Sequence, residues 1–202
     1  RPPRSTLFPT RRSSDLVTAL LAVVASMMMS GCTMTKMGIA FMGMESETQD
    51  AYAKMMDNIS KYGDPARAMM IEAKIDDDVT NDDAAEAIKA ITEERNMRVT
   101  GDVKMFRKDD AAPDEVAHAR IISVCNLDTA KVFLNHSRYY GGFMPCRILL
   151  IEYGNGDRYL VTMDLTMAIY GGDPLPDHML DAALIVKDTM EALIYRGAEG
   201  DF

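Results

Sequence analysis

The order of hydrophobic and polar positions divides the chain after residue 65 into alternating strands and helices. Runs typical of strands occupy residues 67–75, 97–107, 118–126, 146–153 and 158–165. Apolar residues with helical spacing connect them over residues 80–91, 127–136 and 177–195. The order βαββαββα predicts a two-layer α+β domain over residues 66–202, with helices packed on a mixed or antiparallel sheet.

Local chemistry marks the start of the first of these helices. Thr80 and Asp83 have the spacing of a capping box, in which each side chain accepts a hydrogen bond from the other residue's backbone N–H. The surrounding run DDDVTNDD also resembles a calcium-binding loop, but it lacks the glycine and the final glutamate of an EF-hand. We therefore interpret these carboxylates as favourable charge at a helix N-terminus.

The clearest hairpin covers residues 146–165, with a turn at residues 154–157. Its first strand is apolar on both faces, with Ile148 and Leu150 on one face and Leu149, Ile151 and Tyr153 on the other. A half-exposed antiparallel hairpin would alternate apolar with polar residues. Helices of the same chain, the helix ahead of the domain or a second copy must cover the second face, and we predict a homodimer through this hairpin.

A tether segment, residues 32–65, precedes the domain and holds one amphipathic helix. Tyr52, Met55, Met56 and Ile59 recur at helical spacing, and the glycine at position 63 ends the pattern. This helix could dock on the domain, pair with another copy or lie near a bilayer.

An uncharged apolar run occupies residues 16–29. It is short for a membrane span, which needs about 20 residues, but it has the length of a signal-peptide core. It ends in Met29-Ser30-Gly31-Cys32, which resembles the bacterial lipobox, although leucine is commoner than methionine at the first position. The resemblance implies a signal peptide over residues 16–31 and a lipid anchor on Cys32. With Thr33 next, it also implies attachment to the outer membrane, facing the periplasm.

Residues 1–15 do not look like the start of a signal peptide, because they contain no methionine. The run TLFPTRRSSDL resembles the translation of a sequencing-adapter oligonucleotide with one frame slip. We interpret residues 1–15 as an artefact, with a genuine basic leader as the alternative.

The net charge of the chain is -9, which argues against one class of partner. Nucleic-acid binding relies on neutralising phosphates with lysine and arginine, and an acidic surface repels such a polyanion. We therefore expect no nucleic acid among the partners.

Short motifs in the domain resemble the family called domain of unknown function 302. These are the sequence Val124-Cys125-Asn126 at a strand end, Met144 to Ile148 at the start of the hairpin, and Glu152 ahead of the turn. The resemblance covers residues 66–195. It implies a small domain of α and β elements, often dimeric, with no settled biochemical activity.

Cys125 and Cys146 are the two cysteines that remain after the expected anchor. An exported protein meets an oxidising compartment, so they could form a disulfide, remain buried thiols, or ligate a metal or haem. Cys125 ends one strand and Cys146 begins the next, so the two can meet only if these strands are antiparallel.

Other candidate chemistry is weak. Met163, Met167 and His136 complete with the cysteines a candidate soft-metal or haem site, so copper or haem is the alternative to having no cofactor. Motifs for zinc, c-type haem and serine hydrolases are absent from the sequence, and the histidines, His118 and His178 included, have no acid partner recognisable by spacing. We expect a lipid-anchored ligand-binding or interaction module, with a redox or metal protein second and an enzyme last.

Overall fold

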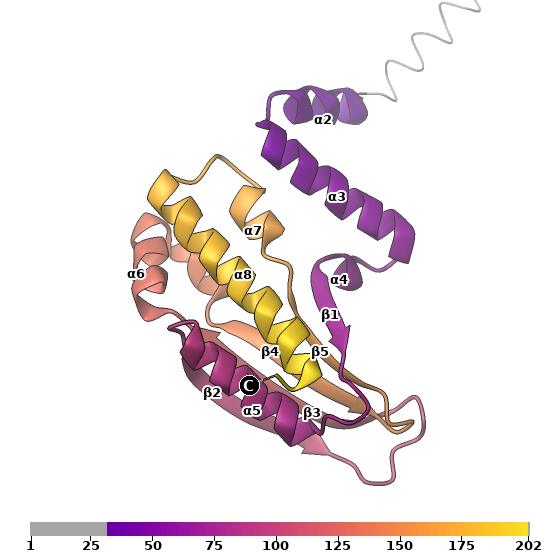
Figure 1. The fold of residues 1–202 in the computed structure, drawn as a ribbon. Helices are drawn as coiled ribbons and strands as arrows, with labels where there is room; N and C mark the ends of the chain where they lie inside the picture. The colour runs from indigo at the N-terminus through magenta and orange to yellow at the C-terminus, as the bar shows by residue number, and fades with distance from the viewer. Residues whose placement is uncertain (1–31, 202) are drawn as a thin grey trace, which may run out of the picture. The chain divides into compact units, whose positions relative to one another are not determined.

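The computed structural model describes residues 32–201 of the chain (Figure 1). The expected signal peptide and residues 1–15 lie outside the described residues. The described residues divide into two units between Met44 and Glu45. In the first unit, α2 spans Cys32–Met42, and its side chains are exposed from Lys36 onward. Within residues 32–201, no helix combines the length and apolar character needed to cross a membrane.

The second unit is built on a five-stranded sheet in the order β1-β5-β4-β3-β2. The strands are β1 Met70–Lys74, β2 Arg98–Arg107, β3 Val116–Cys125, β4 Cys146–Tyr153 and β5 Arg158–Met163. Every neighbouring pair is antiparallel. The sequence left a mixed or an antiparallel sheet open, and the sheet is antiparallel. The predicted α+β class and element order are confirmed.

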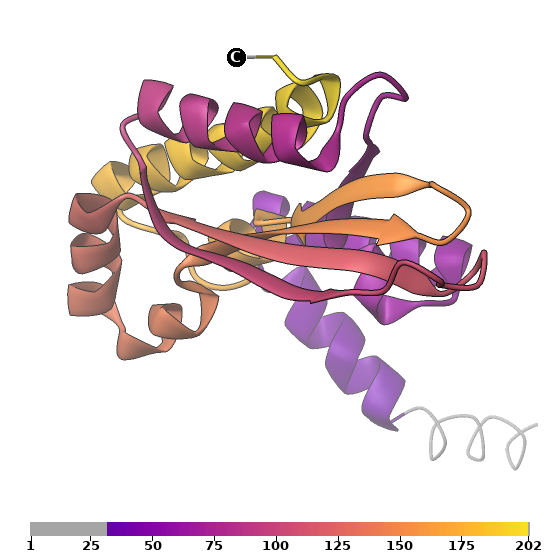
Figure 2. The ribbon, with the colours of Figure 1, turned by 90° about the horizontal axis from the view of Figure 1, so that it is seen from below.

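Two long helices, α5 (Asn81–Glu94) and α8 (Asp177–Glu199), lie side by side on one face of the sheet (Figures 1 and 2). Fully buried side chains between the two layers include Ile88, Ile122 and Leu160. Burying each large aliphatic side chain contributes roughly 1.5–3 kcal/mol, so this interface is the main core. The predicted capping box at Thr80 starts α5.

The opposite face of the sheet is more open. Leu149, Ile151 and Val161 of the hairpin are only half-buried, and they line surface cavities. The amphipathic helix expected in the tether segment is α3 (Ser46–Tyr62), which packs mainly on α4 (Pro65–Ala68) and α7 (Thr166–Tyr170).

Two predicted strand ends are wrong because an aspartate side chain accepts a hydrogen bond from the backbone at the start of a short helix there. Asp64 accepts a hydrogen bond of 2.8 Å from the Ala66 backbone N–H, so α4 forms and β1 begins three residues later than predicted, at Met70. Asp164 likewise accepts one of 2.9 Å from the Thr166 N–H, so β5 ends ahead of it and α7 follows.

The end of the sheet near Cys146 carries a second, smaller core. Helix α6 (Leu127–His136) and the 3-10 helix η1 (Arg138–Phe143) form it with α7 and the start of α8. Its buried side chains are Phe133, Ile169, Leu175, Met179 and Ala183.

Candidate functional site

A row of charged and polar side chains crosses four strands of the sheet near the start of α5. The register sets Arg107 opposite His118, His118 opposite Glu152, and Glu152 opposite Arg158. Directly opposed residues project from the same face of a sheet. This is the face that carries α5 and α8, because Glu152 lies two positions after the buried Leu150. We call these four residues the polar row.

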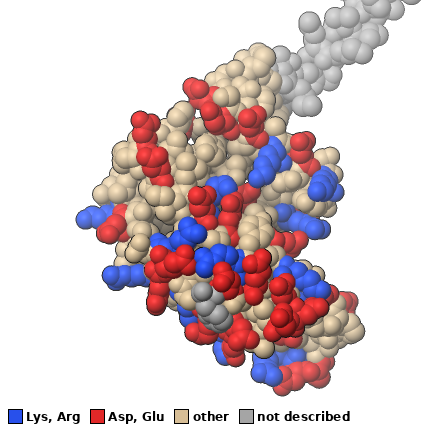
Figure 3. Space-filling model, viewed as in Figure 1, with Lys and Arg blue, Asp and Glu red and all other residues tan. Residues whose placement is uncertain are grey.

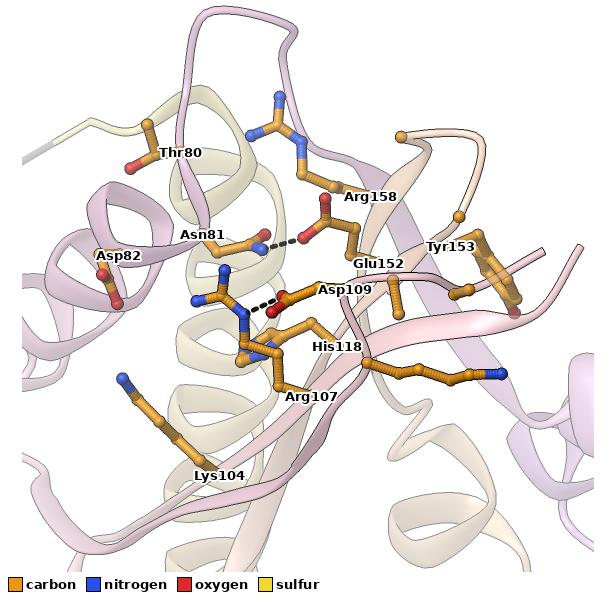
Figure 4. A pocket seen from close by; sticks show the side chains of 15 residues that line it. Thr80, Asn81, Asp82, Lys104, Arg107, Asp109, His118, Glu152, Tyr153 and Arg158 are labelled. Atoms are coloured by element: carbon orange, nitrogen blue, oxygen red, sulfur yellow. Dashed lines mark hydrogen bonds and ion pairs between the residues drawn. The ribbon is translucent and has the colours of Figure 1, made fainter. Parts of the chain in front are cut away.

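The polar row lines a cavity of about 500 Å³ (Figure 4). Its other walls come from the start of α5, from Lys104 on β2, from the β2–β3 loop and from the β4–β5 turn. Elements distant in sequence therefore meet around one space. A cavity of this volume is in the range typical of small-molecule sites.

The cations around the cavity differ in how strongly they are held. Arg158 donates to the backbone carbonyls of Asp76, Asp77 and Val79, which fixes the loop ahead of α5. Arg107 donates to Asp109 at 2.7 Å on an exposed loop. Lys104 lies in the β2–β3 ladder, and its side chain makes no ion pair or hydrogen bond with the residues that the structure describes. Lys104 is thus the cation with charge available to a bound group, and Arg107 is held only by an exposed carboxylate that a bound anion can replace.

These cations form a local cluster. The chain is acidic overall, with a net charge of -9, and acidic and basic side chains are interspersed on the face that Figure 3 shows. A broad basic patch that would attract a polyanion is not seen on that face. The cavity is suited to a small anion instead.

Two acceptor groups face the cations. The Asn81 side-chain amide donates to a carboxylate oxygen of Glu152 (Figure 4). The Asn81 carbonyl oxygen Oδ1 is buried, and no donor reaches it from the described residues. Buried polar atoms are nearly always paired, and an unpaired one costs roughly 1–3 kcal/mol. Oδ1 therefore favours a ligand that brings an N–H or O–H donor.

His118 lies between the acidic and basic members of the row. Burial lowers the pKa of its imidazole below the ordinary value of 6.5, and the nearby cations Lys104, Arg120 and Arg107 lower it further, while Glu152 opposes them. The ring is consequently neutral at pH 7, with one nitrogen as donor and the other as acceptor.

A buried ion pair holds α5 over this end of the sheet. Arg120 is only 6% exposed, and its guanidinium donates to both carboxylate oxygens of Asp102, at 2.7 and 2.6 Å. It also reaches Asp82 in the first turn of α5, at 3.2 Å. The hydrogen bonds from Arg120 lower the pKa of Asp102 to about 2. The first turn of α5, which carries Asn81 into the cavity, is anchored by these contacts.

Comparison with known proteins identifies the family. Residues 71–195 match the model of the domain of unknown function DUF302. The chain belongs to this family. The crystal structure of an uncharacterised conserved DUF302 protein from Bacillus stearothermophilus is similar, with a TM-score of 0.50 and 15% identity over 63% of this chain and 97% of the other. That likeness supports the fold alone, and no curated protein matches.

The DUF302 domain of this chain holds Cys125 and Cys146 as free thiols. The antiparallel pairing of β3 with β4 meets the condition for their approach, and Val124, next to Cys125, lies opposite Cys146. Burial and then the neighbouring Cys125 raise the pKa of Cys146 to about 11, and burial raises that of Cys125. Both thiols are protonated at neutral pH, which disfavours redox reactivity. A disulfide between them stays a prediction.

The other residues predicted as metal or haem ligands lie in two separate parts of the DUF302 domain. Met163 and Met167 line one cavity between α3 and α7. His136 lies on α6, with its ring centroid 6.1 Å from that of Tyr140. Among residues 32–201, no group of three or more histidine, cysteine, aspartate or glutamate side chains is placed to hold a metal.

The polar row was missed at the level of sequence, apart from Glu152. His118 has the acid neighbour that spacing did not reveal, since Glu152 lies opposite it on β4. One signal was present in the sequence. His118, Arg120, Ile122 and Val124 occupy every second position, so ionisable residues continue the apolar face of a strand.

Proposed function

We propose that this DUF302 domain binds a small anionic molecule in the cavity of the polar row, and that lipid on Cys32 holds it at the outer membrane, facing the periplasm. One observation carries the binding proposal: four strands and a helix start bring lysine and arginine side chains, a neutral imidazole and an unpaired buried carbonyl oxygen to one cavity of about 500 Å³.

The chemistry of the walls defines the ligand class. Lys104 and Arg107 would attract an acidic group, a carboxylate or phosphate, because charge-assisted hydrogen bonds are the strongest available. Asn81 Oδ1 and Glu152 would accept from a hydroxyl or an ammonium group on the same molecule. The expected ligand therefore combines an acidic group with a hydrogen-bond donor on a short frame.

A matched pair of probes tests this binding. Lactate and propionate share a carboxylate and carbon skeleton, and only lactate has the hydroxyl that Asn81 Oδ1 would meet. Isothermal titration should show tighter binding of lactate, because an unpaired buried acceptor is costly. Equal binding of the two, or no binding of either, would contradict the proposed ligand class.

Substitution locates the site. Lys104→Gln and Arg107→Gln should each weaken lactate binding by roughly tenfold, since a hydrogen bond to a charged group contributes about 1.5–3 kcal/mol. Lys131→Gln makes the same change of charge on the exposed surface of α6 and should leave binding unchanged. A loss that is equal in all three variants would point to long-range charge rather than to this cavity.

The anchor rests on the lipobox resemblance and the apolar run ahead of it. In cells, Cys32→Ser should abolish labelling of the protein by radioactive fatty acid and leave an uncut precursor. Undiminished labelling of this variant would refute the anchor.

A further inference from the structure

Four methionines line one small cavity near Met163, at the opposite end of β5 from Arg158 of the polar row. Met55 of α3, Met69 after α4, Met163 of β5 and Met167 of α7 line a space of about 170 Å³. This cavity shares no lining residue with the cavity of the polar row. We call these residues the methionine cluster.

The exposure of the cluster distinguishes it from core filler. Methionine commonly fills gaps in hydrophobic cores, as Met179 and Met190 do here at 2% and 1% exposure. Met69 is 40% exposed, and the other three members are half-buried. The methionine cluster is therefore partly open to solvent.

Hydrogen bonds hold the walls of this cavity in place. The Thr48 hydroxyl donates to the Gly172 carbonyl at 3.1 Å, and the Tyr52 hydroxyl donates to the Gly171 carbonyl at 3.0 Å. Lys54 pairs with Asp164 at 3.1 Å. These contacts fix α3, which carries Met55, against the loop and helix around Met167.

Thioether sulfur is a neutral, soft ligand that suits Cu(I), whereas hard cations prefer oxygen. Asp164 also lines the cavity, but its charge is balanced by Lys54, so a bound ion would rely on the neutral thioethers. We propose that the methionine cluster binds one Cu(I) ion through the sulfur atoms of Met55, Met69, Met163 and Met167. The cysteines and His136 take no part, and this site is independent of the anion site.

Methyl NMR of the full chain, purified in a mild detergent and labelled with ¹³C at the methionine methyl groups, tests the site directly. The background carries Cys32→Ala, Cys125→Ala and Cys146→Ala, so thiols do not compete, and Ag(I) serves as a redox-inert probe for Cu(I). The four methyl signals of the cluster should shift together and saturate at one equivalent of Ag(I). Unmoved cluster signals at that point would overturn the proposal.

Adjacent residues on α3 provide the matched control. Met55→Leu should weaken Ag(I) binding at the cluster by at least about tenfold, the scale on which even outer-shell partners change metal affinity. Met56→Leu alters an exposed side chain outside the cavity and should leave it unchanged. Both exchanges nearly conserve volume, so the fold should persist. Equal Ag(I) binding by the two variants would overturn the proposal. Neither variant should change lactate binding, so this test is separate from that of the anion site.

Discussion

At the scale of single residues, the placement of the cavity depends on the ion pair between Arg120 and Asp102. A nearly buried guanidinium is tolerated because its donors are matched by two aspartates, one on β2 and one in α5. Asp102 also has a second cationic partner, because the Lys89 ammonium lies 3.3 Å from its carboxylate. Removing one partner leaves a charge poorly paired, which costs more than the pair itself contributes.

Asp102→Asn should therefore destabilise the fold by roughly 2 kcal/mol, measured by urea denaturation at pH 7. The folded-state pKa of Asp102 is about 2 against an ordinary 3.8. A lowered carboxyl pKa contributes stability above pH 3.8 that is lost as pH falls toward 2. The difference between wild type and variant should shrink over that range. Asp57→Asn, on the exposed surface of α3, should change little, and an equally large effect there would refute the argument.

Single residues also explain why the site was harder to predict than the fold. Thr80 and Asp83 gave the start of α5 because capping is a local interaction between neighbours in sequence. The partners of His118 come from β2 and β4, so they depend on strand register, which the sequence pattern does not specify. Asn81 appeared only as part of an acidic run.

At the scale of elements, the end of the cavity is formed where two hairpin tips touch. The Gly154 N–H donates to the Glu115 carbonyl at 2.9 Å, and the Asn155 N–H donates to the Pro113 carbonyl at 3.1 Å. The β4–β5 turn thus rests on the β2–β3 loop. A glycine is required at position 154 because a Cβ there would lie 2.1 Å from the Ala112 carbonyl oxygen.

Gly154→Ala should push the two tips apart, destabilise the fold by roughly 1–3 kcal/mol, and weaken lactate binding. Chemical denaturation and titration measure the two effects. Gly142→Ala serves as the control, because a Cβ at that position would meet no atom within 4 Å. Native stability and binding in Gly154→Ala would show that the contact between the tips is unimportant.

The periodicity of the sequence predicted the main elements well, and the errors arose at short helices. The patterns at residues 127–136 and 146–153 coincide with α6 and β4, because long apolar stripes report directly on the buried face. Helix α7 was missed because five residues carry too little periodicity, and the hydrogen bond from the Thr166 N–H to Asp164 is not visible in the sequence pattern.

At the scale of the whole molecule, we propose that the open face of the sheet pairs with a second copy. The register places Val103, Ile121, Leu149 and Val161 in one apolar row across four strands. Val103 is 58% exposed. An extended apolar surface of this kind is typical of an interaction site.

Light scattering of the compact unit from Glu45 onward should give the mass of a dimer at tens of micromolar. Leu149→Glu should give a monomer, because a carboxylate in a closed apolar interface is costly. Val132→Glu, on the exposed side of α6, should leave the dimer intact. A monomeric wild-type unit would contradict the proposal.

The titration of His118 tests the anion site most directly. An anion bound beside the ring favours the protonated imidazole, so the pKa of His118 should lie below 6.5 in the free protein and rise when lactate saturates the cavity. NMR of the histidine ring protons against pH measures this, with His136 and His178 as internal controls that should not respond. A His118 titration that lactate leaves unchanged, or an equal shift at His136, would contradict binding at the polar row.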